Sequence, residues 1–290
     1  MGYKEIYNSW KNDPESFWMT AADAIDWVKK PSKALFSARA PLYEWFCDSE
    51  VNTCYNAIDR HVLNGRANQK AIIYDSPVTD TKYSITYSEL HEKVATLAGA
   101  LLAKGISKGD RVIIYMPMVP EGLISMLACA RIGAIHSVVF GGFASNELAV
   151  RIDDAKPKAI LAASCGIEPN RIIEYKPLID AAINLSDHEP QTVVILQRPQ
   201  CTAELIDGRD YDWMEFQKTA KEAQQLNQRM TALYEDIGHV LNRYYDIDEA
   251  HVYGHDDEDS EIEEKLDKVD PSKVEPKDDF KDREDKDIDN

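Results

Sequence analysis

The residues with the clearest capacity for chemistry are Gly141 and Gly142, within the segment FGGFAS at positions 140–145. This segment joins a predicted strand to a predicted helix, where paired glycines let a ligand's phosphate approach backbone N–H groups. The same glycines suit a tight turn that needs positive φ, and the chemistry of the residues alone favours the turn. The two common phosphate loops, GxxxxGK followed by Ser or Thr and GxGxxG, do not occur in the sequence.

Two other clusters contain titratable side chains. Asp59, Arg60 and His61 combine an acid, a cation and a titratable ring, but such a triplet is far more often a local ion pair. His251 and His255 are four residues apart beside acidic residues, a spacing that could bind a metal weakly, yet no third ligand is fixed nearby. The sequence therefore predicts no metal site and identifies no catalytic residue.

The cysteines and the hydropathy of the sequence indicate the kind of compartment in which the protein is expected. The five cysteines are an odd number without CxxC spacing, which favours reduced thiols in an intracellular protein over disulfides or zinc. No stretch approaches ~18 uninterrupted apolar residues, so we expect no membrane span. The first ten residues lack both the apolar core of a secretory signal and an Arg-rich amphipathic leader, so no targeting segment is recognised.

The formal charge of −18 on the 290-residue chain is concentrated near its C-terminus. Residues 231–290 contain 22 acidic and 8 basic side chains, whereas residues 1–230 contain 29 acidic and 25 basic ones. A nucleic-acid-binding protein needs a basic face that releases counterions, so this class is excluded. Hydrophobic residues make up 44% of the chain, which is enough for a buried core and excludes disorder throughout.

Short apolar strands alternate with helical patterns through the middle of the chain. The run RVIIYM at 111–116 is of the kind buried in parallel sheets. Strands separated by 10–15-residue helical patterns indicate βαβ units, so we predict an α/β fold with a doubly wound parallel sheet. The predicted strands are residues 70–74, 82–86, 111–116, 135–140, 158–164 and 192–196, and helices are predicted to begin after residue 86 and near residues 120, 145 and 177.

The segments outside this alternation differ in composition. Residues 1–66 are rich in aromatic side chains without clean periodicity, which indicates an irregular segment pinned by large residues. Residues 219–245 contain a possible helix. Residues 246–290 are dominated by Asp, Glu and Lys and cannot bury enough apolar surface, so we predict a disordered acidic tail. A partial sheet domain at 67–218 completes this predicted organisation.

Three stretches closely resemble the short-chain acyl-CoA synthetases, specifically the acetyl- and propionyl-CoA synthetases of the adenylate-forming superfamily. They are YMPMVPEGLISMLACARIGAIHSVVFGGFASNELAVRIDDAKPK (115–158), NTCYNAIDRH (52–61) and ITYSELHEKVATLAGALLAKGISKGDRV (85–112). The resemblance extends over residues 5–218, and FGGFAS with RIDDAKPK is more similar to the propionyl branch. It implies that residues 1–66 are the family's N-terminal segment and residues 67–218 the first part of its AMP-binding domain.

The resemblance implies AMP-forming ligation, in which carboxylate and ATP form an acyl-adenylate and the CoA sulfur then displaces AMP. The implied cofactors are ATP, CoA and Mg²⁺, and the implied substrate is propionate or acetate. In related enzymes the 3′-phosphate of CoA lies near the second glycine of FGGF and two downstream arginines, which correspond here to Gly142, Glu168 and Arg171. Glu168 departs from the arginine of acetyl-type members, and its charge would repel a phosphate. The implied cofactor-binding residues are therefore Gly142 and Arg171.

Several motifs of the family have no counterpart in this sequence: the TSGTTGxPKG phosphate loop, the tryptophan-containing acyl pocket, the TGD segment and the C-terminal domain with a catalytic lysine. The resemblance fades near Asp212, so we expect a chain truncated before the ATP-binding loop and inactive alone, as an alternatively ended product or a misassembled gene model. The alternative function is non-catalytic: self-association, or binding of a full-length synthetase or a basic protein partner, through an exposed sheet edge or the acidic tail. The implied compartment is the mitochondrial matrix or the cytoplasm.

Overall fold

A computed structural model of the protein describes residues 2–220. The predicted acidic tail at 246–290 lies outside the described residues, as does the predicted helix at 219–245 apart from its first two positions. Within residues 2–220, no helix combines the length and the apolar character that crossing a bilayer requires.

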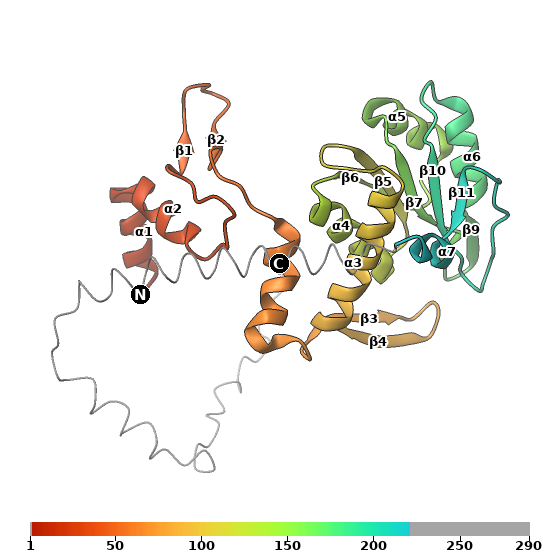
Figure 1. The fold of residues 1–290 in the computed structure, drawn as a ribbon, viewed down its shortest axis with the longest axis horizontal. Coiled ribbons are helices and arrows are strands. Elements are labelled where there is room, and N and C mark those ends of the chain that lie inside the picture. The colour runs from red at the N-terminus through yellow and green to blue at the C-terminus, as the bar shows by residue number, and fades with distance from the viewer. Residues whose placement is uncertain (1, 221–290) are drawn as a thin grey trace, which may run out of the picture. The chain divides into compact units, whose positions relative to one another are not determined.

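A five-stranded parallel sheet forms the centre of the described fold (Figure 1). Its spatial order is β6-β5-β7-β10-β11. The strand that follows β5 in the chain, β6, lies at one edge of the sheet, and the later strands β7, β10 and β11 follow one another on the other side of β5. The strands are β5 (Arg111–Met116), β6 (Ile135–Phe140), β7 (Ala159–Ala163), β10 (Thr192–Leu196) and β11 (Asp210–Asp212). Four of these strands lie where the sequence predicted them, and the short β11 was not predicted.

Helices cover both faces of this sheet because successive side chains of each strand point to opposite faces. Val112 and Ile114 of β5 pack in one hydrophobic core, whereas Ile113 and Tyr115 pack in the other. The first core contains residues of α3 (Tyr87–Ala103), α4 (Pro120–Ile132) and α7 (Trp213–Lys218), and the second contains residues of α5 (Ser145–Ala155) and α6 (Tyr175–Leu185). The predicted α/β fold with a doubly wound parallel sheet is confirmed.

Local signals in the sequence set the ends of two of these helices. At the start of α3, the Thr86 backbone N–H donates to Glu89 Oε2 at 2.7 Å, and the Glu89 N–H donates to Thr86 Oγ1 at 3.2 Å. This is the predicted capping box, which satisfies two backbone donors at the helix terminus. α4 begins with Pro120 and is followed by Gly133 in the left-handed conformation, with φ of 73°.

Two hairpins distinguish the structure from the predicted alternation. β3 (Lys70–Ser76) and β4 (Thr81–Thr86) pair with each other in antiparallel fashion and are not part of the parallel sheet. A second antiparallel hairpin, β8 (Cys165–Glu168) and β9 (Arg171–Glu174), was not predicted and lies between β7 and α6. Its strands have four residues each, which is too short to reveal an alternating pattern.

The N-terminal segment contains more regular structure than the sequence indicated. Asp13 accepts a hydrogen bond from the Ser16 N–H at 3.0 Å, and Pro14 opens the helix that follows, so a capping signal without clean hydrophobic periodicity still starts a helix. Large side chains do contact one another here: the Trp18 and Trp45 rings lie 5.4 Å apart. The elements are α1 (Tyr3–Asn12), α2 (Pro14–Ala22), β1 (Leu35–Phe36), β2 (Glu44–Trp45) and two π-helical turns, Tyr55–Asp59 and Val62–Arg66.

The triplet at positions 59–61 does not form the local ion pair that was predicted. The buried Asp59 carboxylate accepts a hydrogen bond from Arg131 Nη2 of α4 at 2.7 Å, and its other oxygen lies 3.1 Å from His91 Nε2 of α3. Arg60 instead donates to the Ala24 carbonyl at 2.9 Å. The prediction was wrong because the partner of Asp59 lies 72 positions away, which a local pattern cannot show.

Candidate functional site

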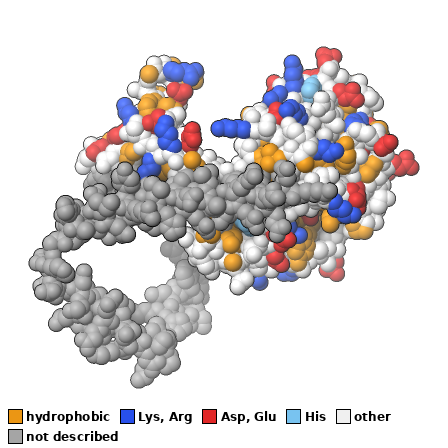
Figure 2. Space-filling view, viewed as in Figure 1, with side chains coloured by type: hydrophobic (Ala, Val, Ile, Leu, Met, Phe, Trp, Pro, Cys, Tyr) orange, Lys and Arg blue, Asp and Glu red, His pale blue; other side chains and the backbone are white. Residues whose placement is uncertain are grey.

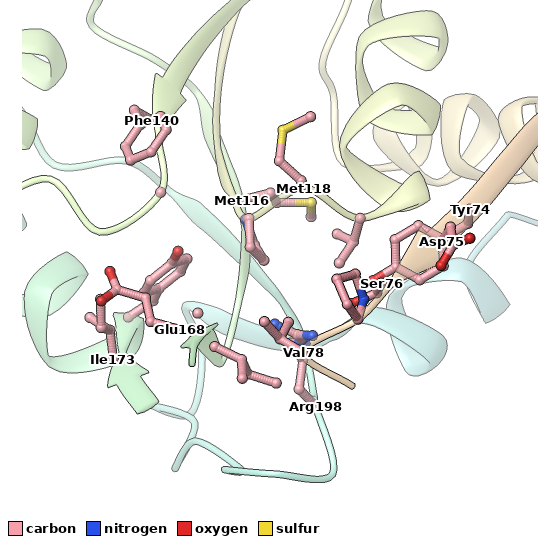
Figure 3. Close-up of a pocket in the computed structure, with 17 residues that line it drawn as sticks. Tyr74, Asp75, Ser76, Val78, Met116, Met118, Phe140, Glu168, Ile173 and Arg198 are labelled. Carbon is pink, nitrogen blue, oxygen red and sulfur yellow. The ribbon is translucent and has the colours of Figure 1, made fainter. Parts of the chain in front are cut away.

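A cavity of about 350 Å³ opens at the carboxyl ends of the parallel strands (Figure 3). The strand order reverses between β5 and β7, and the crevice at such a reversal is where doubly wound sheets bind ligands. The volume is within the range of small-molecule sites. The lining residues are 74–78, 116–119, Phe140, Gly141, Gly166–Glu168, Ile173, Tyr175 and Arg198.

The cavity walls come from five separate segments of the chain. Figure 3 shows Tyr74, Asp75 and Ser76 of β3 on one side and Glu168 and Ile173 of the β8–β9 hairpin on the other. Met116, Met118 and Phe140, from the ends of β5 and β6 and the turn after β5, form the remaining wall. These walls are mainly apolar and aromatic, so they suit a flat ring with a charged substituent better than a fully polar ligand.

The FGGF turn lies beside this cavity and leaves no room for side chains. A Cβ on Gly141 would lie 2.6 Å from Tyr175 Oη and 2.7 Å from the Met116 carbonyl oxygen. Gly142 adopts a φ of 94°, which other residues rarely adopt. The turn interpretation of these glycines is therefore confirmed, and a role in binding phosphate stays a prediction.

Tyr175 lines the cavity and packs against the two glycine segments. A Cβ on Gly166 would lie 2.4 Å from Tyr175 Oη, so the hydroxyl occupies the space between Gly141 and Gly166. The ring lies 5.0 Å from that of Tyr115, whose hydroxyl donates to the Phe143 carbonyl at 2.8 Å. Burial raises the pKa of Tyr115 to about 12, and burial also raises the pKa of Tyr175. Both phenols are therefore neutral packing groups at physiological pH.

The two residues predicted to bind a cofactor lie at the rim of the cavity rather than in its lining. Gly142 follows the lining residue Gly141, and its Cβ position would be 3.8 Å from Ile173 Cδ1. Arg171 is exposed on β9, where its Nε lies 2.7 Å from Glu168 Oε2. The hydrogen bond from Arg171 lowers the pKa of Glu168, so this carboxylate is charged at neutral pH. Glu168, which was expected to repel a phosphate, thus forms an ion pair with Arg171, which was expected to bind one.

Arg198 lines the cavity and was not among the predicted site residues. It lies directly after β10, where its backbone N–H donates to Ser164 Oγ at 2.8 Å and its Nη1 donates to the Cys165 carbonyl at 3.2 Å. Residues that follow the carboxyl ends of parallel strands carry the ligand sites of this fold class. Applying that rule to the predicted strand 192–196 would have identified Arg198.

Charges of both signs are interspersed on the described surface that Figure 2 shows, so that face has no basic patch of the kind a nucleic acid would require. Within residues 2–220, no group of three or more His, Cys, Asp or Glu side chains is arranged to hold a metal ion. His251 and His255 lie outside the described residues.

Two family models match the chain. A model described as AMP-binding enzyme matches residues 59–236, and one described as acetyl-coenzyme A synthetase N-terminus matches residues 3–57. The first match covers more than half of the chain. The two matched segments are consecutive and together account for the sheet domain and the aromatic N-terminal segment.

Curated relatives match the same part of the chain. The mouse protein named acyl-CoA synthetase short-chain family member 3, mitochondrial, is 53% identical over 214 residues, which are 73% of this chain and 31% of the relative. The propionate–CoA ligase of Salmonella typhimurium is 44% identical over 213 residues, which are 73% of this chain and 34% of that protein. The chain therefore spans about a third of the length of these relatives.

A solved structure supports the same fold. Acetoacetyl-CoA synthetase from Streptomyces lividans superposes with a TM-score of 0.66 over 75% of this chain and 33% of that chain, at 20% sequence identity. At this level of identity the match establishes the fold and carries no statement about substrates.

Proposed function

The chain belongs to the AMP-binding enzyme family, and on this premise we propose that its described residues form the coenzyme A-binding part of a short-chain acyl-CoA synthetase. The observation that carries the proposal is the cavity where the strand order reverses, bordered by the FGGF turn. Its aromatic and apolar walls suit the adenine ring of CoA, and Arg198 offers a cation to the phosphates.

The proposed reaction of the whole protein is AMP-forming ligation of propionate or acetate to CoA. The names of the mouse and Salmonella relatives support an acyl or propionate substrate. ATP would activate the carboxylate as an adenylate with release of pyrophosphate, and the CoA sulfur would then displace AMP, with Mg²⁺ offsetting phosphate charge. The described residues offer Mg²⁺ no cluster of ligands, so we assign it to none of them.

The described residues contribute to the second half of this reaction. We propose that the 3′-phosphate of CoA lies at the rim near Gly142 and Arg171, where the ion pair of Arg171 with Glu168 offers it little net charge, and that the cavity beside them holds the rest of the nucleotide. The phosphate-loop motif TSGTTGxPKG, which the family resemblance associates with ATP, does not occur in the 290 residues. We therefore expect the 290-residue chain to bind CoA and to form no acyl-CoA from propionate, ATP and CoA.

Calorimetric titration of the chain with CoA tests the binding part of this proposal. The expected result is a saturable heat with a Kd of about 10⁻⁵ to 10⁻³ M, which corresponds to roughly −4 to −7 kcal/mol. A Met118→Trp variant serves as the test of the cavity, because Met118 lines the cavity and is exposed, so the larger side chain narrows the cavity without displacing core residues. Equal binding by this variant, or no binding by the unchanged chain, would contradict the assignment of the cavity.

A coupled assay for AMP release tests the second part. The chain is incubated with propionate or acetate, ATP, CoA and Mg²⁺, and the products are separated chromatographically. Formation of AMP and acyl-CoA in equal amounts would overturn the expectation that these residues do not turn over substrate alone.

We propose the mitochondrial matrix as the compartment, because the name of the mouse relative includes that organelle. The cytoplasm is the competing location, since the relative from Salmonella is bacterial. Immunofluorescence of the endogenous protein with a matrix marker separates the two, and a diffuse signal would exclude the matrix.

A further inference from the structure

The charged side chains that line the cavity differ in whether an ion pair within the protein already neutralises them. Its lining contains two carboxylates, and each has a basic partner that does not line the cavity: Asp75 contacts Lys82 Nζ at 2.5 Å, and Glu168 contacts Arg171. Arg198 is the one Lys or Arg in the lining. No carboxylate lies within 4.0 Å of its guanidinium in the part of the chain that the structure describes.

Arg198 is also held in place before any ligand arrives. Its backbone N–H donates to Ser164 Oγ, and its carbonyl accepts a hydrogen bond from the Cys201 N–H at 3.2 Å. Its Nη1 is fixed to the Cys165 carbonyl, whereas Nε and Nη2 donate to no acceptor among residues 2–220. A guanidinium held on one side and open on the other presents a fork of donors suited to phosphate oxygens.

Arg171 is in a different state. It is exposed, and both Nε and Nη2 donate to the Glu168 carboxylate, at 2.7 Å and 3.4 Å. A phosphate approaching Arg171 therefore meets a carboxylate at nearly the same distance, so the attraction and the repulsion largely cancel. Solvent and salt screen the remaining electrostatic attraction between Arg171 and the phosphate, because this rim is exposed.

We propose that Arg198 is the phosphate-binding residue of the cavity, where it binds the diphosphate of CoA, and that the Glu168–Arg171 pair makes the site indifferent to the 3′-phosphate. This inference rests on the proposed function, because it takes the ligand to be CoA. It assigns the anchoring cation to a residue that neither the FGGF motif nor the family resemblance indicates. It also gives Glu168 a defined role, which is to neutralise Arg171.

Calorimetry with two probes, CoA and dephospho-CoA, tests the proposal on the 290-residue chain. The unchanged chain should bind the two probes with affinities within about twofold of each other, because only the 3′-phosphate distinguishes them. Arg198→Gln should weaken binding of both probes about tenfold or more, since it removes a charge-assisted hydrogen bond from the diphosphate. Arg198→Lys keeps the charge without the fork and should recover part of the loss.

Variants at the rim provide the matched controls. Arg171→Gln removes an arginine as Arg198→Gln does, yet it should change the affinity for either probe less than twofold. Glu168→Gln releases Arg171 and should strengthen binding of CoA about threefold or more relative to dephospho-CoA. Circular dichroism of each variant establishes that it is folded, and Arg198→Lys supplies the test at position 198 if the glutamine variant is not.

The outcomes separate this inference from the proposed function. If the unchanged chain binds neither probe, both fall. The inference is overturned, and the assignment of the cavity stands, if the unchanged chain binds CoA and both Arg198→Gln and Arg198→Lys bind it with the same affinity as the unchanged chain. The same holds if Arg171→Gln loses more affinity for CoA than Arg198→Gln does. A preference of the unchanged chain for CoA above about fivefold would contradict the role of Glu168.

Discussion

The ion pair between Asp59 and Arg131 offers the sharpest test of what stabilises the described fold. The two side chains are 3% and 0% exposed, and Arg131 Nη2 lies 2.7 Å from Asp59 Oδ2. The pair joins the π-helical turn Tyr55–Asp59 to α4 (Pro120–Ile132), and His91 of α3 lies 3.1 Å from the second carboxylate oxygen. Three elements therefore meet at one buried carboxylate.

Replacing this carboxylate by an amide of the same shape, Asp59→Asn, should lower the free energy of unfolding by about 3–5 kcal/mol. The reason is that the buried guanidinium loses the negative charge that faces it, while the desolvation cost of that guanidinium remains. A single domain has a total stability of about 5–15 kcal/mol, so the loss would raise the unfolded fraction by roughly 10² to 5 × 10³ times. Urea unfolding followed by far-ultraviolet circular dichroism measures the change.

Asp75→Asn is the matched control, because it removes the same charge from an ion pair that is open to solvent. The Asp75 and Lys82 side chains are 55% and 73% exposed, so solvent screens the pair and it contributes little to stability. The difference between the two variants isolates the effect of burial. If Asp59→Asn costs less than about 1 kcal/mol, or no more than Asp75→Asn, the reasoning from burial is refuted.

Three further outcomes follow from local contacts. Hydrogen bonds from Lys158 and Ser107 lower the pKa of Asp110 to about 2, below its unfolded value of 3.8, so its contribution to stability is present above about pH 4 and is lost as the pH falls towards 2. Urea unfolding should therefore show an Asp110→Asn deficit at pH 6 that disappears near pH 2, and a constant deficit would contradict this. Thr86→Ala removes the cap of α3 and should cost about 1 kcal/mol in the same assay, whereas Thr86→Ser should cost little. Burial raises the pKa of Cys54 to about 11 and that of Cys129 to about 12, so iodoacetamide at pH 8 should label the exposed Cys47 first, as read by peptide mass spectrometry; equal labelling of all three would count against the buried placement.

Much of the sheet domain could be predicted because its strands are apolar runs bounded by strong helix signals. The strand 111–116 is buried on both faces, and Thr86, Pro120 and Gly133 lie at helix ends as their chemistry requires. The β8–β9 hairpin and helices α1 and α2 were missed because short strands and capped but weakly periodic helices leave little pattern in a sequence.

The candidate site was predicted less completely than the fold. The glycine turn could be located, since paired glycines after an apolar strand are a local feature. Arg198 and Tyr175 reach the same cavity from β10 and α6, and Asp59 finds its partner on α4, so each depends on tertiary contacts between distant positions. The resemblance indicated Arg171, but only the geometry shows that Glu168 occupies its guanidinium.

The contact between Tyr175 and the glycines limits the order in which substitutions can accumulate in this protein. A Cβ at position 166 would meet the ring atoms Cε1 and Cζ at 2.8 Å as well as the hydroxyl, so alanine becomes tolerable there only after Tyr175 has been replaced by a side chain smaller than phenylalanine. At position 141 the Met116 carbonyl itself lies 2.7 Å away, and no change at position 175 relieves that contact. Gly166 can therefore be replaced once Tyr175 has been replaced by a smaller side chain, whereas no substitution at position 175 makes a replacement of Gly141 tolerable.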